Sequence, residues 1–98
     1  MNIDNHYDIS KYVFEFIKND FKYDSNWFYL DKNLNWIHDI NYKRLKTFIM
    51  TKVVNELINQ SIKNIDNDYI SSKYIHLSIK LKNHNYIIMI IKELRQFY

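Results

Sequence analysis

Apolar residues recur at helical spacing in the first part of the chain, over residues 8–20. They follow the i, i+3, i+4, i+7, i+8 pattern that lines one face of a helix, and they are Ile9, Tyr12, Val13, Phe16 and Ile17. The spacing predicts a helix from Asp8 to Asp20. The carboxylate of Asp8 is the expected N-cap, because it can accept from a free backbone N–H of the first turn.

The longest helical pattern covers residues 42–65 and carries two adjoining apolar stripes. One stripe is Leu45, Phe48, Ile49, Val53 and Leu57, and the other is Met50, Val54, Ile58, Ile62 and Ile65. We expect one helix of about 36 Å, at 1.5 Å per residue, whose wide apolar face contacts more than one neighbour. The run of Asn and Asp at 64–68 then favours a turn, since these side chains compete for backbone hydrogen bonds.

Two short aromatic-rich runs, residues 26–30 and 34–38, are typical of strands. They predict a two-stranded β-hairpin across residues 31–33. Because the chain has no Gly, Asn33 is the expected left-handed turn residue. A hairpin of two strands is marginal alone, so its aromatic side chains should pack on the helices.

Residues 69–82 match two patterns. Helical spacing links Ile70, Tyr74, Leu77 and Leu81, whereas alternating polar and apolar residues at 75–81 match a strand. We favour the helix, because no partner strand is evident.

A last helix is predicted from about residue 85 to residue 97, capped by Asn83 or Asn85. Its apolar residues run to the end of the chain, so we expect the domain to be incomplete there. The expected fold is α+β and mainly α, with about four helices and one short two-stranded hairpin in a single domain, residues 1–98.

The composition excludes several classes of site. The 98 residues include no Gly, Pro, Cys or Ala. Without Gly the chain cannot form a phosphate-cradling P-loop, a dinucleotide-binding turn or a nucleophile elbow. Without Cys it has no disulfide, thiolate nucleophile or cysteine zinc site. Its longest apolar run, residues 86–91, is far below the ~20 residues that span a bilayer. We expect a soluble intracellular chain that has no membrane partner and no cofactor.

No local pattern favours a metal site. Neither i, i+4 spacing nor a neighbouring Cys joins the four histidines, which are His6, His38, His76 and His84. Asp66 and Asp68 resemble a pair that holds Mg²⁺ with a phosphate, but they equally suit an interhelix turn with a cap. We expect no metal site and no enzyme activity for this chain alone. A nuclease that uses Asp66 and Asp68 is the one catalytic alternative.

The formal net charge of +3 permits an acidic partner such as nucleic acid without requiring one. Basic residues gather near the start of the long helix and around the final helix. The candidate phosphate contacts are Lys43, Arg44, Lys46, Lys80, Lys82, Lys92 and Arg95, with Lys52 further along the long helix. The alternative is a solvated polar face in a chain whose Lys outnumber its Arg by 12 to 2.

The hairpin aromatic residues Trp27, Tyr29 and Trp36 have two interpretations. They could form a stacking platform for single-stranded bases. Alternatively they fill the space between the hairpin and the helices, which is the interpretation we favour.

The order of these motifs resembles a known viral module. The similar segments are Tyr12-Val13-Phe14-Glu15-Phe16, Phe21-Lys22-Tyr23, Trp27-Phe28-Tyr29-Leu30 with the following Trp36, and the closing Ile90-Ile91-Lys92-Glu93-Leu94-Arg95-Gln96-Phe97-Tyr98. In primase–helicases of poxviruses, other large DNA viruses and some phages and plasmids, this module precedes the superfamily 3 helicase. The resemblance covers roughly His6 to Tyr98.

The resemblance implies a non-catalytic module of a DNA replication primase–helicase, which assists assembly of the helicase motor or its engagement with DNA. The implied partners are DNA, a helicase or primase domain, or a second copy of the chain. The implied location is a viral replication site in the cytoplasm or nucleus of a host cell. The Walker loops that follow this module in the family are absent here, so the resemblance carries over the replication context and not the ATPase activity. The alternative is a small helical protein–protein interaction domain unrelated to replication.

Overall fold

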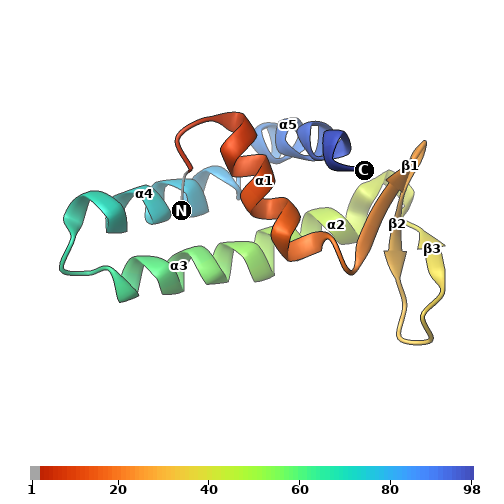
Figure 1. The fold of residues 1–98 in the computed structure, drawn as a ribbon, viewed down its shortest axis with the longest axis horizontal. Coiled ribbons are helices and arrows are strands. Elements are labelled where there is room, and N and C mark those ends of the chain that lie inside the picture. The colour runs from red at the N-terminus through yellow and green to blue at the C-terminus, as the bar shows by residue number, and fades with distance from the viewer. Residues whose placement is uncertain (1–2) are drawn as a thin grey trace.

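A computed structural model describes residues 3–98, which form four helices and a three-stranded antiparallel sheet (Figure 1). The helices are α1 (His6–Ile17), a long helix built from α2 (Lys43–Phe48), a π-helical turn (Ile49–Val53) and α3 (Val54–Lys63), then α4 (Asp68–Lys80) and α5 (His84–Leu94). The strands are β1 (Phe21–Asp24), β2 (Asn26–Leu30) and β3 (Trp36–His38), in the order β1-β2-β3. Short 3-10 turns cover Ile40–Tyr42 and Arg95–Phe97. The predicted class, α+β and mainly α, is confirmed, and α4 confirms the helical alternative for residues 69–82.

Asparagine side chains cap the N-termini of three of these helices. Asn5, Asn67 and Asn83 each accept, at 2.9–3.2 Å, from the backbone N–H three residues further on. Each thereby satisfies a donor that the first turn leaves free. Asn83 was one of the two predicted caps of the last helix. The predicted Asp8 cap is wrong, because α1 begins at His6 and Asp8 lies inside its first turn.

The sheet has one strand more than the predicted hairpin. β1 pairs with β2 in antiparallel register, with Phe21 opposite Tyr29 and Asp24 opposite Asn26. Ser25, at φ 60°, makes the tight connection between the two strands. Only four residues long, β1 follows α1 without the Gly or Pro that usually marks a boundary, so the sequence pattern does not reveal it.

The turn between β2 and β3 is left-handed at Leu34 (φ 65°), not at the predicted Asn33. The Asp31 carboxylate accepts from the backbone N–H groups of Asn33 (2.9 Å) and Asn35 (2.8 Å). This Asx-type turn determines the path of the loop, and the left-handed conformation falls on an exposed leucine.

The long helix buries a stripe of strict four-residue spacing, namely Leu45, Ile49, Val53, Leu57 and Ser61. In a regular α-helix each step of four residues advances about 40° around the axis, so this stripe would drift by about 160°. A π-helical turn accommodates one extra residue, which reduces the drift to about 60°. Both halves of the helix can therefore face the same core.

The elements form an elongated body of 43 × 25 × 21 Å. α1 packs on α5, and α4 folds back along α3. Figure 1 shows the sheet at one end of the molecule, beside α2, and the turn between α3 and α4 at the other end. The buried side chains of Phe21 and Trp27, both from the sheet, belong to the common hydrophobic core. Within residues 3–98, no helix combines the length and the apolar character needed to cross a bilayer.

Candidate nucleic-acid interface

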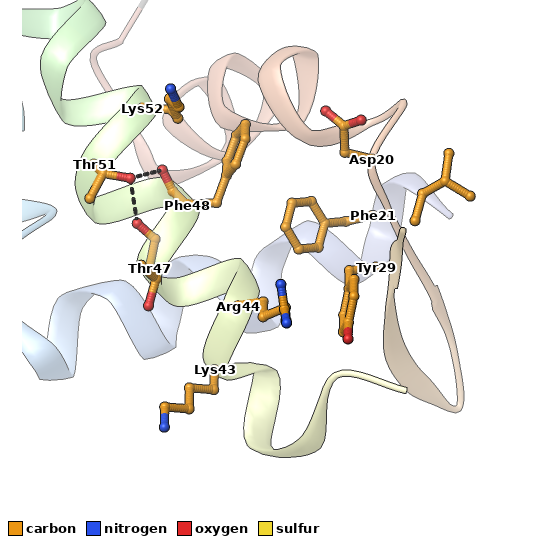
Figure 2. Close-up of a pocket in the computed structure, with 10 residues that line it drawn as sticks. Asp20, Phe21, Tyr29, Lys43, Arg44, Thr47, Phe48, Thr51 and Lys52 are labelled. Atoms are coloured by element: carbon orange, nitrogen blue, oxygen red, sulfur yellow. Dashed lines mark hydrogen bonds between the residues drawn. The ribbon is translucent and has the colours of Figure 1, made fainter. Parts of the chain in front are cut away.

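A groove of about 690 Å³ lies between the sheet and the first half of the long helix (Figure 2). Three cationic side chains line it, those of Lys43, Arg44 and Lys52, and Asp20 supplies its one carboxylate. Among residues 3–98 the ion pairs are Lys18 with Glu15 and Lys73 with Asp4. The three groove cations therefore have no carboxylate partner within the described part of the chain, and the groove is electropositive.

Arg44 lies against the sheet side of the groove. Its guanidinium carbon is 4.2 Å from the centroid of the Tyr29 ring, and Figure 2 shows the two side chains facing each other. The contact is a cation–π interaction, which holds the cation in place while leaving its charge uncompensated. Arginine offers a planar fork of N–H donors that matches a phosphate.

The buried carboxylate of Asp39 positions this arginine. Asp39 is 3% exposed, and its two oxygens accept from the backbone N–H groups of Arg44 and Leu45, both at 2.9 Å. Its own N–H donates to the Trp27 carbonyl at 2.8 Å. One residue thus fixes the start of α2 and ties it to β2. The sequence contains a signal for this role, an Asp shortly before a helical pattern.

Three residues separate Asp39 from α2, and the last two of them are left-handed. Asn41 has φ 55° and Tyr42 has φ 46°. Asparagine tolerates this conformation, whereas at a residue such as Tyr42 it costs roughly 1–2 kcal/mol. The two hydrogen bonds accepted by Asp39 offset that cost, so the first turn of α2 is held where its cations meet the sheet.

The π-helical turn forms the far wall of the groove. Thr51 and Lys52 belong to it, and the Thr51 hydroxyl donates to the Thr47 carbonyl at 2.8 Å (Figure 2). The same hydroxyl is 3.4 Å from the Phe48 carbonyl, so it bonds to the backbone of the preceding turn. π-turns of this kind occur often at functional sites.

Lys46 and Lys80 of the predicted contacts lie away from this groove. The Lys46 ammonium is 2.8 Å from Nδ1 of His84, between α2 and α5. Lys80 lies 5.9 Å from the centre of the Tyr86 ring.

The last three predicted contacts are on the C-terminal side of the chain. Arg95 lies 5.0 Å from the Tyr23 ring and lines a second, smaller hollow of about 290 Å³. Lys82 and Lys92 are exposed and do not line the groove. The structure brings together only Lys43 and Arg44 of the seven, and adds Lys52.

The three hairpin aromatic residues have different surroundings. Trp27 is 3% exposed and packs edge-on against Tyr98, with ring centroids 5.5 Å apart. Tyr29 lines the groove beneath Arg44. Trp36 is 39% exposed on the outside of the sheet. Trp27 therefore lies in the space between sheet and helices, whereas Trp36 does not.

Tyr98 links the sheet to the helices behind the groove. The Tyr98 hydroxyl donates to the Phe21 carbonyl at 3.0 Å, and burial raises the pKa of this phenol. Burial, with a smaller effect of the Glu56 carboxylate, raises the pKa of Tyr12 to about 12. Both phenols are neutral at pH 7, and Tyr98 stabilises the strand that forms one wall of the groove.

The candidate metal ligands are dispersed. Within residues 3–98 there is no group of three or more His, Cys, Asp or Glu side chains that could hold a metal ion. Asp66 lies in the turn between α3 and α4, and Asp68 is the first residue of α4. Both are exposed at the end of the molecule opposite the sheet (Figure 1).

Comparisons of the chain with protein-family models, with curated proteins and with solved structures find no match.

Proposed function

We propose that this chain is a non-catalytic nucleic-acid-binding module whose groove holds the sugar–phosphate backbone of DNA. The observation that carries the proposal is the convergence of Lys43, Arg44 and Lys52 on one groove without a carboxylate partner. Phosphate oxygens would compensate these charges, and the counterions released from the DNA would favour binding. The aromatic floor formed by Tyr29 and Phe48 provides apolar surface beside the charges.

The proposed context is DNA replication, where the module assists assembly or DNA engagement of a superfamily 3 helicase motor. This context rests on the resemblance of the motifs. The fold adds one supporting fact, because the hairpin and closing motifs meet where Trp27 packs on Tyr98. A module that only positions DNA for a separate motor needs no nucleotide loop, which agrees with a chain that has no Gly.

Fluorescence anisotropy with a labelled single-stranded oligonucleotide tests the proposal. If three phosphates are contacted, the observed affinity falls with a salt exponent of about 0.7 per contact, or about 18-fold between 50 and 200 mM salt. Binding that is absent at 50 mM salt would rule out the proposed DNA contact.

A matched pair of variants locates the binding. The double variant Arg44→Gln/Lys52→Gln removes two groove charges and should weaken binding by about tenfold or more. The control Lys11→Gln/Lys63→Gln removes two exposed charges of the same sign on α1 and α3, and should change affinity much less. Equal losses in both variants would mean that net charge and not the groove determines binding.

A second candidate function is protein–protein interaction through the end of the α3–α4 hairpin. Ile62, Ile65 and Tyr69 are exposed there, within eight consecutive residues of the chain. Apolar residues clustered on a surface often mark an interaction site. Sedimentation at several concentrations, together with binding of a hydrophobic dye, tests this alternative, and a monomer that binds no dye would exclude self-association through this surface.

A further inference from the structure

The outer face of the sheet carries a row of rings. In β2 the side chains of Trp27 and Tyr29 point to the helices, so the alternating Phe28 points outward. The register places Phe28 opposite His38, on the same face of the sheet. The rings of this pair are 5.8 Å apart. Trp36, two residues before His38, lies on that face as well.

Lys22 covers part of this row. It is paired with Phe28 across β1 and β2, and its ammonium lies 4.7 Å from the Trp36 ring centroid and 5.6 Å from the Phe28 centroid. One cation therefore lies over two rings that belong to different strands. The carboxylate on the same face, Asp24, lies beyond Lys22 on the side away from Trp36, as its pairing with Asn26 shows.

A sheet with one buried side normally presents polar side chains to water. This face does so with Lys22, Asp24, Asn26 and His38, but it also presents the ring of Trp36, which is 39% exposed. The hydrophobic core does not need this ring, because Trp27 already fills the space on the inner side. Accessible flat rings beside a lysine are the arrangement on which unpaired bases stack.

The row is continuous with the basic groove. Leu30 lines the groove, and the same residue is paired with Trp36 across β2 and β3. A chain of nucleotides whose phosphates lie in the groove would therefore pass Leu30 and reach the rings.

We propose that Trp36, Phe28 and His38 form a stacking surface for unpaired bases, so that the ligand of the groove is a single strand. This inference rests on the proposed function and specifies the class of its ligand. A duplex would not use the surface, because the faces of its bases are covered by their neighbours. The rings would bind without sequence preference, since every base has a flat face.

The test compares three labelled ligands of equal length: oligothymidylate, an abasic single strand with the same phosphates, and a duplex. Wild-type protein should bind oligothymidylate on the order of tenfold more tightly than the abasic strand. Trp36→Ala removes the most exposed aromatic side chain of the three and should reduce this difference strongly, while leaving binding of the abasic strand unchanged. Trp36→Phe keeps a ring and should retain most of the preference.

Tyr69→Ala is the matched control. Tyr69 is 70% exposed, and the Lys73 ammonium lies 4.8 Å from its ring centroid, so it is also an exposed ring beside a lysine. It lies on α4, away from the sheet, and its loss should leave the base preference intact. Circular dichroism of all variants should show unchanged folding, because each changed side chain is exposed.

The outcomes separate this inference from the proposed function. Equal, salt-dependent binding of oligothymidylate and the abasic strand would overturn the stacking surface and leave the groove standing. No binding of any strand would overturn both. Self-association of the wild type that Trp36→Ala abolishes, without a base preference, would assign the face to a second copy and overturn the inference.

Discussion

Replacing Asp39 with alanine should destabilise the protein strongly although the residue belongs to a connection between elements. Its carboxylate accepts two backbone hydrogen bonds, from Arg44 and Leu45, at 2.9 Å each. Both donors belong to the first turn of α2, where no carbonyl of the helix can replace the lost acceptor.

The size of the effect follows from burial. Loss of a helix cap costs about 0.5–2 kcal/mol, and a donor left without a partner in a buried position costs roughly 1–3 kcal/mol. Asp39 is 3% exposed, so water cannot easily reach the freed N–H groups. We expect the free energy of unfolding to fall by about 3 kcal/mol. The variant would also lack the two hydrogen bonds that offset the strain of the left-handed backbone at Asn41 and Tyr42.

Urea denaturation followed by circular dichroism measures this loss, and Asp31→Ala is its control. Asp31 also accepts from two backbone N–H groups, those of Asn33 and Asn35, but in an exposed turn. Water can replace it there, so the control should lose less than about 1 kcal/mol. Equal losses in the two variants, or an Asp39→Ala protein as stable as wild type, would refute the reasoning.

Three further predictions concern the core and its tyrosines. Leu57→Ala removes a fully buried side chain and should lower the free energy of unfolding by about 3 kcal/mol in urea; a loss below about 1 kcal/mol would mean that the core is not packed around the long helix. Tyr98→Phe removes the hydrogen bond to the Phe21 carbonyl and should cost about 1 kcal/mol, whereas no change would show that the bond does not form. Stability should fall as the pH rises above 10, because the Tyr12 phenol ionises near pH 10 when unfolded but has a pKa of about 12 when folded, and burial raises the pKa of Tyr98 as well. Unfolding curves from pH 8 to 11 check this, and Tyr12→Phe should lessen the decline without removing it.

The helices could be predicted because their signal is local. Apolar spacing identified every helix, and even the ambiguous residues 69–82 proved helical as α4. β1 could not be predicted, because strand pairing depends on a partner and four residues carry almost no periodicity. The left-handed conformation of Leu34 could not be predicted either. The hydrogen bonds accepted by Asp31 determine this turn, and they outweigh the intrinsic preference of Asn33 for that conformation.

Only part of the groove could be predicted from the sequence. Lys43 and Arg44 are adjacent, so their grouping needs no tertiary information. Lys52 joins them only because the chain continues from α2 into the π-helical turn beside the sheet. Lys46 follows Arg44 by two residues, but its ammonium group lies beside His84. Charge clusters in a sequence do not show which side of a helix meets a neighbouring strand.

The salt dependence of single-strand binding tests the central claim most directly. For wild-type protein the slope of log affinity against log salt should be about −2, as three phosphate contacts require. The triple variant Lys43→Gln/Arg44→Gln/Lys52→Gln should bring the slope close to zero. A slope that stays near −2 in this variant would contradict the account, because the phosphates would then be held elsewhere.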